Sequence, residues 1–267
     1  MGGGRATVGG MTRQEQEDAV ARAADLLGRA RRVTVLSGAG VSTDSGIPDF
    51  RGPQGVWTTN PEAERLSTFQ DYRDDPEVRR ESWRQRVEHP VWRARPGPAH
   101  RALVDLERSG RLLALVTQNI DELHQAAGSS AEVVLELHGT MHHTVCLSCG
   151  ARAPMSDALE RVRAGEQDPP CPLCGGILKS ATISFGQNLD VDVLQRARRA
   201  AAGCDVLLAV GTSLGVHPAA GLVEVAAMAG ADIVIANAEP TPYDDLAAVV
   251  LRGRLGEVLP RIVGGGR

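Results

Sequence analysis

The chain has 267 residues and is 42% hydrophobic, which is enough for one large α/β domain with a small insertion. Its formal net charge of -4 argues against a nucleic-acid binder, because such proteins need cationic side chains to neutralise phosphates. No apolar run reaches the ~18 residues of a membrane helix, and the N-terminus lacks the apolar core of a secretion signal. We therefore expect a cytoplasmic protein that binds neither membrane nor nucleic acid directly.

The first residues divide into a tail and two predicted elements. Residues 1–11 are rich in glycine and are expected to be a disordered tail, with either Met1 or Met11 as the start. An apolar stripe from Val20 to Leu27 predicts a helix that packs on the core. The β-branched run that begins at Val33 predicts a buried strand.

That strand runs into the glycine-rich turn Gly38-Ala39-Gly40. Glycines without a Cβ let the backbone turn sharply and approach a ligand, as in the phosphate-binding turns of doubly wound folds. The usual dinucleotide fingerprint is broken, because Thr43 replaces the third glycine. No acidic residue ends a second strand about 20 residues later. The pattern predicts a nucleotide site that does not serve hydride transfer.

A polar loop and a charged segment follow the turn. The loop ends in Asp49, Phe50 and Arg51, which offer a carboxylate, an aromatic face and a guanidinium at the edge of a ligand. From about residue 52 to residue 98 charge is dense and no strand pattern occurs, which indicates a module of short helices. Scattered aromatic residues are expected to anchor this module to the main domain: Trp57, Phe69, Tyr72, Trp83 and Trp92.

The rest of the chain alternates apolar strands with helical patterns. This alternation predicts a mostly parallel, doubly wound sheet of about six strands. Helices are predicted at 98–109, 191–202 and 219–229. The strands after the first are predicted at Leu112–Thr117, Val133–Leu137, Val206–Val210, Ile233–Ala236 and Ala248–Leu251.

Most of the polar residues of interest follow the carboxyl ends of these strands. Because parallel sheets bind ligands at that edge, we expect them to form one polar rim. The rim residues are Gly38, Gly40, Gln118, Asn119, Asp121, His138, Gly211, Thr212, Ser213, Asn237 and Glu239.

Four of the five cysteines form two Cys-x2-Cys pairs, Cys146/Cys149 and Cys171/Cys174. In a chain without an export signal this pattern favours a metal site over disulfides. Four thiolates fill a tetrahedral Zn²⁺ and leave no position for a water, so the zinc is expected to be structural. The alternative is four reduced structural cysteines. Cys204 has no partner and is interpreted as a core residue.

His138 is the candidate general base. A histidine before a glycine is commonly a packing or capping residue, but this one ends a strand on the predicted rim. There its near-neutral pKa suits proton transfer. His100, His124 and His217 are weaker candidates.

Several longer strings occur together, in order: GAGVSTDSGIPDFR (38–51), TQNIDELHQAAG (117–128), LHG (137–139), the two cysteine pairs, GTSLGVHP (211–218) and NAEPT (237–241). The chain resembles the sirtuin family, the NAD-dependent protein deacylases, in its bacterial form. The resemblance covers almost the whole chain beyond residue 30.

The resemblance implies a Rossmann-like NAD domain with an inserted small domain made of a zinc ribbon and a helical module. Acyl-lysine would enter the cleft between the two domains. The implied ranges are 12–53, 98–140 and 179–267 for the NAD domain, 54–97 for the helical module and 141–178 for the zinc-binding module.

The resemblance also implies a reaction and its residues. An acyl group would pass from lysine to ADP-ribose with release of nicotinamide, His138 acting as base beside Asn119 and Asp121. The implied NAD contacts are Gly38, Ala39, Gly40, Asp49, Phe50, Arg51, Trp57, Gln118, Asn119, Ile120, Asp121, Gly211, Thr212, Ser213, Asn237, Ala238, Glu239 and Leu255. The implied peptide contacts are Phe185, Gly186, Gln187, Leu214 and Val216.

Two departures from the family pattern bear on the substrate. Gln187 stands where the family usually has glutamate, which affects peptide preference. Members that remove succinyl groups carry a Tyr-x-x-Arg pair, and the nearest match is Trp83 with Arg86. Deacetylation is therefore the expected chemistry, and desuccinylation stays open.

Two other functions remain as alternatives. A mono-ADP-ribosyltransferase would cleave NAD in the same way but label an acceptor protein. A weakly catalytic NAD sensor or zinc-ribbon interaction module would have no need of a base on the rim. We expect a monomer with NAD as co-substrate and one structural zinc.

Overall fold

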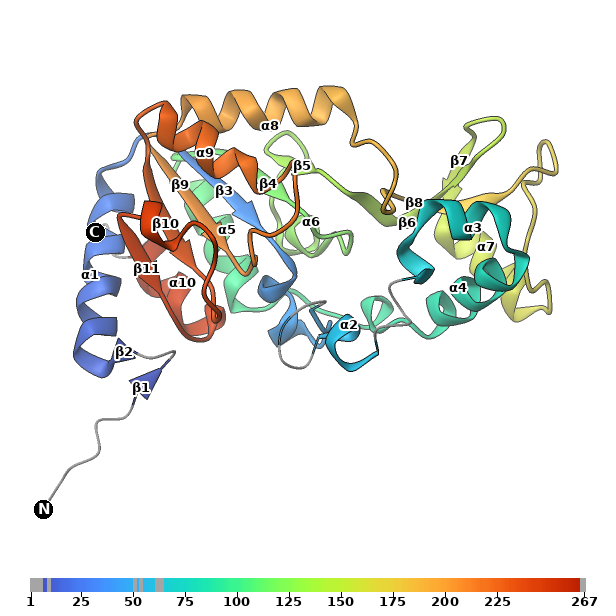
Figure 1. Ribbon diagram of the computed structural model, residues 1–267, viewed down its shortest axis with the longest axis horizontal. Helices are drawn as coiled ribbons and strands as arrows, with labels where there is room; N and C mark the ends of the chain where they lie inside the picture. The colour runs from blue at the N-terminus through green and yellow to red at the C-terminus, as the bar shows by residue number, and fades with distance from the viewer. Residues whose placement is uncertain (1–6, 9–10, 50–51, 53–54, 61–64, 265–267) are drawn as a thin grey trace, which may run out of the picture.

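The computed structural model describes residues 7–8, 11–49, 52, 55–60 and 65–264. A large domain on a six-stranded sheet lies beside a smaller domain on a three-stranded sheet (Figure 1). Within the described residues no helix combines the length and apolarity needed to cross a bilayer.

All neighbouring strands of the large sheet are parallel, in the order β11-β10-β9-β3-β4-β5. This is the Rossmann strand order, and its direction reverses between β3 and β9. The predicted six-stranded parallel sheet is confirmed. The strands are β3 (Val33–Ser37), β4 (Leu112–Thr117), β5 (Val134–Glu136), β9 (Val206–Val210), β10 (Asp232–Ala236) and β11 (Val249–Leu251).

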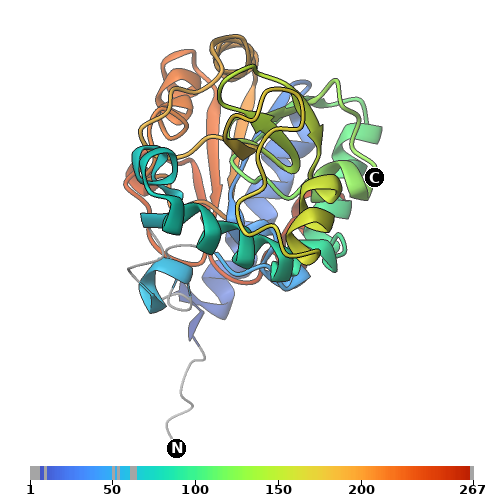
Figure 2. The same cartoon turned by 90° about the vertical axis from the view of Figure 1, so that its right-hand side faces the viewer.

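Helices cover both faces of this sheet (Figure 2). Successive strand residues point to opposite faces, so Val33 and Val35 pack on one helical layer and Leu36 on the other. The first layer holds α1 (Arg13–Arg29), α5 (Pro98–Arg108) and α10 (Leu255–Gly264). The second holds α8 (Val191–Gly203) and α9 (Gly221–Met228), while the short α6 (Leu123–Ala127) packs on α5.

The small domain combines an antiparallel sheet, in the order β7-β6-β8, with short helices. Trp83 is fully buried in its core, beside Met155 and the first cysteine of each pair. The short helices expected between residues 52 and 98 are present, whereas α7 was not predicted. The elements are α2 (Val56–Thr59), α3 (Phe69–Asp74), α4 (Pro76–Glu88), β6 (Gly139–Cys146), β7 (Arg152–Pro154), α7 (Met155–Arg163) and β8 (Leu178–Thr182).

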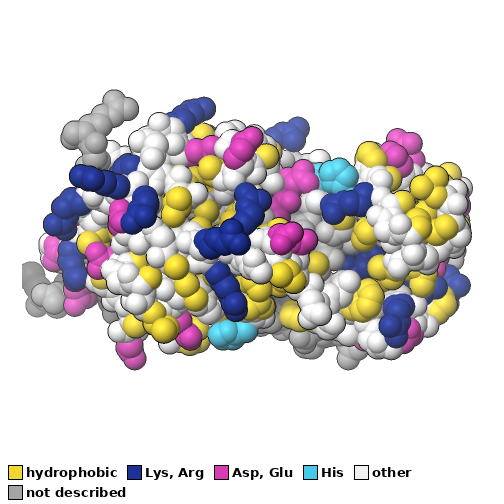
Figure 3. All heavy atoms as spheres, turned by 90° about the horizontal axis from the view of Figure 1, so that it is seen from above, with side chains coloured by type: hydrophobic (Ala, Val, Ile, Leu, Met, Phe, Trp, Pro, Cys, Tyr) yellow, Lys and Arg dark blue, Asp and Glu magenta, His cyan; other side chains and the backbone are white. Residues whose placement is uncertain are grey.

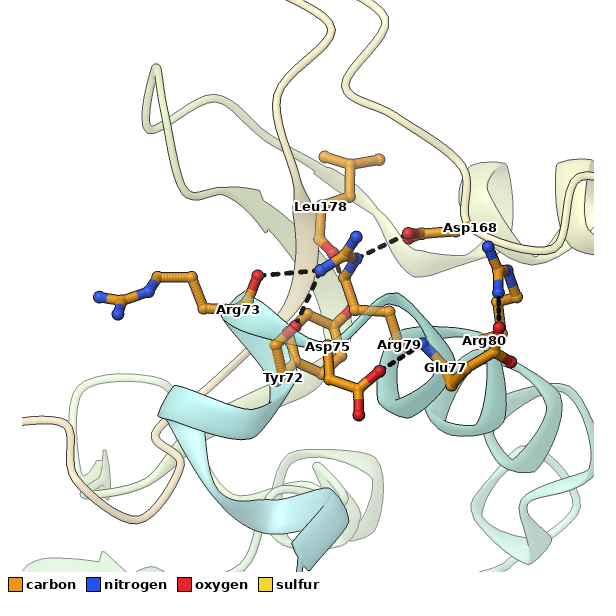
Figure 4. Close-up of polar contacts among 8 residues, drawn as sticks. All are labelled: Tyr72, Arg73, Asp75, Glu77, Arg79, Arg80, Asp168 and Leu178. Atoms are coloured by element: carbon orange, nitrogen blue, oxygen red, sulfur yellow. Dashed lines mark hydrogen bonds and ion pairs between the residues drawn. The ribbon is translucent and has the colours of Figure 1, made fainter.

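Tyr72 of α3 and Arg79 of α4 fasten the helical part of the small domain to the segment between Asp168 and Leu178, where β8 begins (Figure 4). The Tyr72 hydroxyl donates to the Leu178 carbonyl at 2.7 Å, and its burial raises the pKa of Tyr72 to about 12. The Arg79 guanidinium donates from Nε to Asp168 at 2.6 Å and from Nη1 to the Arg73 carbonyl at 2.9 Å. Helices and strands distant in sequence are therefore joined by directional contacts.

Two very short strands lie at the N-terminal end. β1 (Thr7–Val8) pairs antiparallel with β2 (Met11–Thr12). Thr7, Val8 and Met11, which the sequence analysis placed in a disordered tail, therefore lie in β-strands.

At the point where the strand order reverses, the turn after β3 packs directly on the turn after β9. The Gly40 N–H donates to the Gly211 carbonyl at 2.9 Å, and the Gly38 N–H donates to Val210 at 3.0 Å. A Cβ on Gly40 would lie 2.8 Å from the Gly211 Cα, and one on Gly38 would lie 2.6 Å from the Gly211 oxygen. The sequence pattern attributes these glycines to ligand approach. The structure shows that they also let two backbone turns touch.

We expect Gly40→Ala to lower the free energy of unfolding by about 1–3 kcal/mol, because its methyl group must displace backbone rather than a flexible side chain. Gly28→Ala is the matched control. Gly28 lies in α1, and a Cβ added there would have nothing within 4 Å, so alanine should stabilise by about 0.4–1 kcal/mol. Urea unfolding of both variants measures the difference, and equal midpoints would contradict the packing argument.

Candidate active site

The ends of four strands are tied together by hydrogen bonds, which creates the expected rim. Gln118, after β4, donates its backbone N–H to the Ser37 carbonyl at 2.9 Å. Its side-chain Nε2 donates to Thr212 Oγ1 at 3.0 Å, beyond β9. The Gly211 N–H donates to Ala236 at the end of β10 at 2.9 Å. Residues from distant parts of the chain thus lie at one edge of the sheet.

His138 follows β5 on this rim and is half-buried. Its Nδ1 lies 2.9 Å from the Gln118 carbonyl oxygen, which can only accept, so Nδ1 carries the ring proton. Nε2 is then the unprotonated nitrogen. Burial lowers the pKa of His138, and the Gln118 carbonyl opposes that shift only in part. The side chain has the protonation state and tautomer of a general base.

Asn119 and Asp121 are both buried and meet at a residue that the sequence analysis did not select. The Ser42 hydroxyl donates to Asp121 Oδ2 at 2.6 Å and accepts from Asn119 Nδ2 at 3.2 Å. The Leu123 N–H donates to Asp121 Oδ1 at 3.0 Å. In the sequence, the only sign that Ser42 belongs to the site is its place in the string that begins at Gly38.

At the other end of the rim, Asn237 is half-buried while Ser213, Ala238 and Glu239 are exposed. Asn237 Nδ2 donates to the Glu239 carbonyl at 2.9 Å. Arg252, buried and also missed in the sequence, donates to the Asn237 carbonyl at 2.9 Å and pairs with Asp244. The loop at residues 237–239 is therefore largely exposed to solvent, and the buried Arg252 holds it in place through the Asn237 carbonyl.

Other expected NAD contacts have local structural roles. Asp49 accepts from the Gly52 N–H at 3.1 Å and so closes its own loop. Leu255 begins α10 and is buried in the core, and the Ile120 carbonyl accepts from Met141 N–H at 3.0 Å. Phe50, Arg51 and the side chain of Trp57 lie outside the described residues.

The predicted substrate loop is already paired with the helical module. Phe185 forms a parallel bridge to Thr68, in which its N–H donates to Ser67 and its carbonyl accepts from Phe69, both at 2.9 Å. Its side chain is 38% exposed. Gly186 turns the chain with φ +88°.

Two further contacts shape the expected peptide groove. Gln187 Oε1 accepts from the Ser184 N–H at 3.0 Å, so this side chain is used within the loop. Leu214 is another expected peptide contact. Its side chain is 2% exposed, and its backbone has a φ of +52°. Its side chain belongs to the core, and Val216 is half-buried. Any contact of Leu214 with a peptide therefore falls to its backbone.

The four paired cysteines converge as predicted. All four sulfurs lie within 4.8 Å of one another, with Cys146–Cys174 at 3.5 Å and Cys149–Cys171 at 3.8 Å. Tetrahedral zinc with bonds of about 2.3 Å separates its sulfurs by about 3.8 Å, so the set fits. The Ser148 N–H donates to the Cys146 sulfur at 3.4 Å. Cys204 is buried apart from them, as expected.

Trp83 and Arg86 do not resemble an open acyl pocket. Trp83 is fully buried. The Arg86 guanidinium lies 5.4 Å from the Trp83 ring centre and 5.6 Å from that of Tyr72, and donates to Ser180 Oγ at 3.0 Å. Burial lowers the pKa of Arg86. The pair is part of the small-domain core.

Comparison with known proteins agrees with this geometry. The Sir2 family model matches residues 38–218. A relative from Streptomyces coelicolor, named NAD-dependent protein deacetylase 2, is 56% identical over 87% of this chain and 97% of its own. NAD-dependent protein deacetylase 1 of Pyrobaculum aerophilum is 45% identical over 92% and 94%.

Solved structures are similar over the same range. A structure described as the basis for the mechanism and regulation of Sir2 enzymes has a TM-score of 0.85 and 40% identity, covering 94% of this chain and 98% of its own. A Sir2 complex with a deacetylated peptide and 3'-O-acetyl ADP ribose has a TM-score of 0.85 and 33% identity, covering 92% and 98%.

We expect Cys174→Ser to remove bound zinc and loosen the small domain, because a structural zinc contributes its binding free energy to folding. Trp83 packs with Cys146 and Cys171, so its emission should shift to longer wavelength. Elemental analysis and fluorescence measure both effects. Cys204→Ser, remote from the cluster, is the control and should keep one zinc per chain. Full zinc content in Cys174→Ser would contradict the assignment.

Proposed function

The chain belongs to the Sir2 family, and we propose that NAD and an acyl-lysine peptide react at the polar rim with His138 as general base. The protein is an NAD-dependent protein deacylase, which yields free lysine, nicotinamide and O-acyl-ADP-ribose. NAD is its co-substrate, and the four-cysteine cluster is the site of one structural zinc. The comparisons favour this activity over ADP-ribosyl transfer to protein.

The observation that carries the role of His138 is the hydrogen bond from its Nδ1 to the Gln118 carbonyl. That bond leaves Nε2 unprotonated and able to accept a proton from a ribose hydroxyl of NAD. The bond also holds the ring in place, which a base needs because proton transfer requires hydrogen-bond distance. His138 Nε2 is therefore placed to take the proton that the ribose hydroxyl loses and to return it to the lysine nitrogen as that group leaves.

We assign Asn119 and Asp121 to the ribose and nicotinamide side of NAD. Each keeps hydrogen-bonding capacity beyond its contact with Ser42, since an amide and a carboxylate offer several positions. Because the Gly38 and Gly40 N–H groups are used on Val210 and Gly211, we assign the Ala39 N–H of this turn to the phosphates at the switch point, where doubly wound sheets bind nucleotides. Asn237 and Glu239 are assigned to the adenosine half. Open surface at that end leaves room for it.

We propose acetyl as the preferred acyl group. Trp83 is buried and has no phenol to offer, and Arg86 lies beside two rings and donates to Ser180, so only its buried Nη1, which has no hydrogen-bond partner, is left for an acidic acyl chain. The peptide backbone is proposed to add as a strand beside Gly186 and Gly215. Relatives of this chain carry both deacetylase and deacylase names.

We also propose a cytoplasmic monomer that does not bind nucleic acid. On the face seen in Figure 3 basic side chains gather near the centre and acidic side chains lie around them. The formal net charge of -4 gives no excess of positive charge to neutralise phosphates.

His138→Ala should lower kcat/KM for an acetyl-lysine peptide by about 100-fold to 10,000-fold, because general-base catalysis is lost. Its Kd for NAD should stay within about threefold of the unchanged protein. Mass spectrometry of acetyl-, butyryl- and succinyl-peptides with NAD measures turnover and ranks the acyl groups. Turnover that is retained in His138→Ala would contradict the role of His138 as general base.

The same assay separates the possible reactions. His143→Ala is the control, because His143 is exposed on β6 away from the rim. The chain's one lysine, Lys179, is 1% exposed, so the enzyme itself adds little acyl-lysine background. Gain of an ADP-ribose mass on protein without acyl loss would instead indicate the transferase.

The pH dependence of kcat/KM should show an acidic limb centred below 6.5. Burial lowers the pKa of His138, and the base works only when neutral, so activity rises through that pKa and is full at neutral pH. Initial rates between about pH 5 and pH 9 measure the limb. A midpoint above 6.5 would mean that another group limits the rate.

A further inference from the structure

A second pocket opens in the small domain, between α7, β6 and the short turn Pro90–Trp92. Its volume is about 320 Å³, within the range of about 300–1,000 Å³ that is usual for small-molecule sites. None of its lining residues is among the expected NAD or peptide contacts, so the pocket lies outside the predicted active site. The lining residues are Trp92, His142, Met155, Ser156, Leu159 and Arg163.

One face of α7 forms the floor and the edge of this pocket. Met155, Leu159 and Arg163 follow one another at intervals of four along the helix, so their side chains lie on the same stripe. Met155 and Leu159 are buried, whereas Arg163, in the last turn, is exposed. The pocket therefore has an apolar floor and a cation at its edge.

The aromatic wall of the pocket is held in place by backbone carbonyls. Trp92 Nε1 donates to the Arg86 carbonyl at 2.5 Å, and His142 Nε2 lies 3.1 Å from the Asp121 carbonyl oxygen. The two rings meet nearly edge to face, at 77°, with their centres 5.3 Å apart. A ligand thus meets a wall that is already formed, which lowers the entropy lost on binding.

Arg163 is the part of the pocket that selects for charge. Among the described residues it makes no hydrogen bond or ion pair, whereas Arg161, on the same helix, pairs with Glu166 at 2.7 Å. The acidic residues of α7, Asp157 and Glu160, are exposed and do not line the pocket. A free guanidinium at the edge of an apolar pocket matches a carboxylate.

We propose that this pocket binds a small organic carboxylate with a flat, apolar body, the carboxylate pairing with Arg163 and the body packing on Leu159 and Trp92. The Trp92 ring and the Met155 thioether both favour contact with an aromatic body. A nucleotide fits less well, because its further phosphates would face an apolar floor. The proposal goes beyond the deacylase function and does not depend on it.

The probe for this site is 2-naphthoate, which combines one carboxylate with a flat apolar body. Calorimetric titration of the zinc-loaded full chain should give one site with a Kd of about 0.1–1 mM, the affinity expected of a ligand of this size. The neutral 2-naphthamide should bind about threefold to fivefold more weakly, because it cannot form the ion pair. Acetate, which has the charge without the body, should show no binding at the same concentrations.

Arg163→Gln tests the ion pair. This variant should bind 2-naphthoate about threefold to fivefold more weakly and 2-naphthamide unchanged, so that the two ligands become equal. Arg198→Gln is the control, because it removes the same charge from an exposed position on α8. It should bind 2-naphthoate as the unchanged protein does. An equal loss in both variants would indicate a general charge effect and would overturn the assignment.

The indole N–H signal of Trp92 locates the bound probe. In heteronuclear NMR spectra this signal, identified by its loss in Trp92→Phe, should shift in parallel with the calorimetric curve. Saturating NAD should change the Kd of 2-naphthoate by less than about twofold, because the two sites are separate. The proposal would be overturned by a lack of saturable binding, by a Trp92 signal that does not move, or by displacement of the probe with NAD.

Discussion

The backbone contact between the turns after β3 and β9 is the constraint on which the rest of the site depends. Gly40 donates to Gly211 across the point where the strand order reverses, and neither residue has room for a Cβ. This contact places the end of β9, with Thr212, beside the end of β4, with Gln118. Because the two turns meet backbone against backbone, this contact does not depend on any side chain, and the Gln118–Thr212 hydrogen bond adds to it.

At this rim, the ring proton of each of two histidines is placed by a backbone group that can only accept or only donate a hydrogen bond. The Gln118 carbonyl fixes the proton of His138 on Nδ1, and the Gly97 N–H fixes that of His100 on Nε2. The Ser42 hydroxyl, 3.5 Å from His100 Nε2, donates its own proton to Asp121. The base proposed at His138 must be unprotonated on the side that faces its substrate, and the Gln118 carbonyl, whose hydrogen-bonding role does not change with pH, favours that state.

The small domain depends on different interactions. Its core is small, and it is held by four cysteine sulfurs that fit zinc and by the contacts of Tyr72 and Arg79. The loop at Phe185 leads back toward α8 but pairs with residues 67–69 of the helical part. The predicted peptide-binding side is therefore shaped by the helical module as well as by the sheet rim.

Local patterns in the sequence determined the strands, most of the helices, the cysteine pairs and the rim residues, because periodicity and short spacings act within a few residues. The strings around Gly38, Asn119 and His138 identified the family and its reaction. Only the tertiary structure decided that Ser42 and His100 support Asn119 and Asp121, that Arg252 holds Asn237, and that Trp83 is core. These partners lie far apart along the chain. A hydrogen-bond direction depends on which atoms the fold brings together, and no local pattern carries that information.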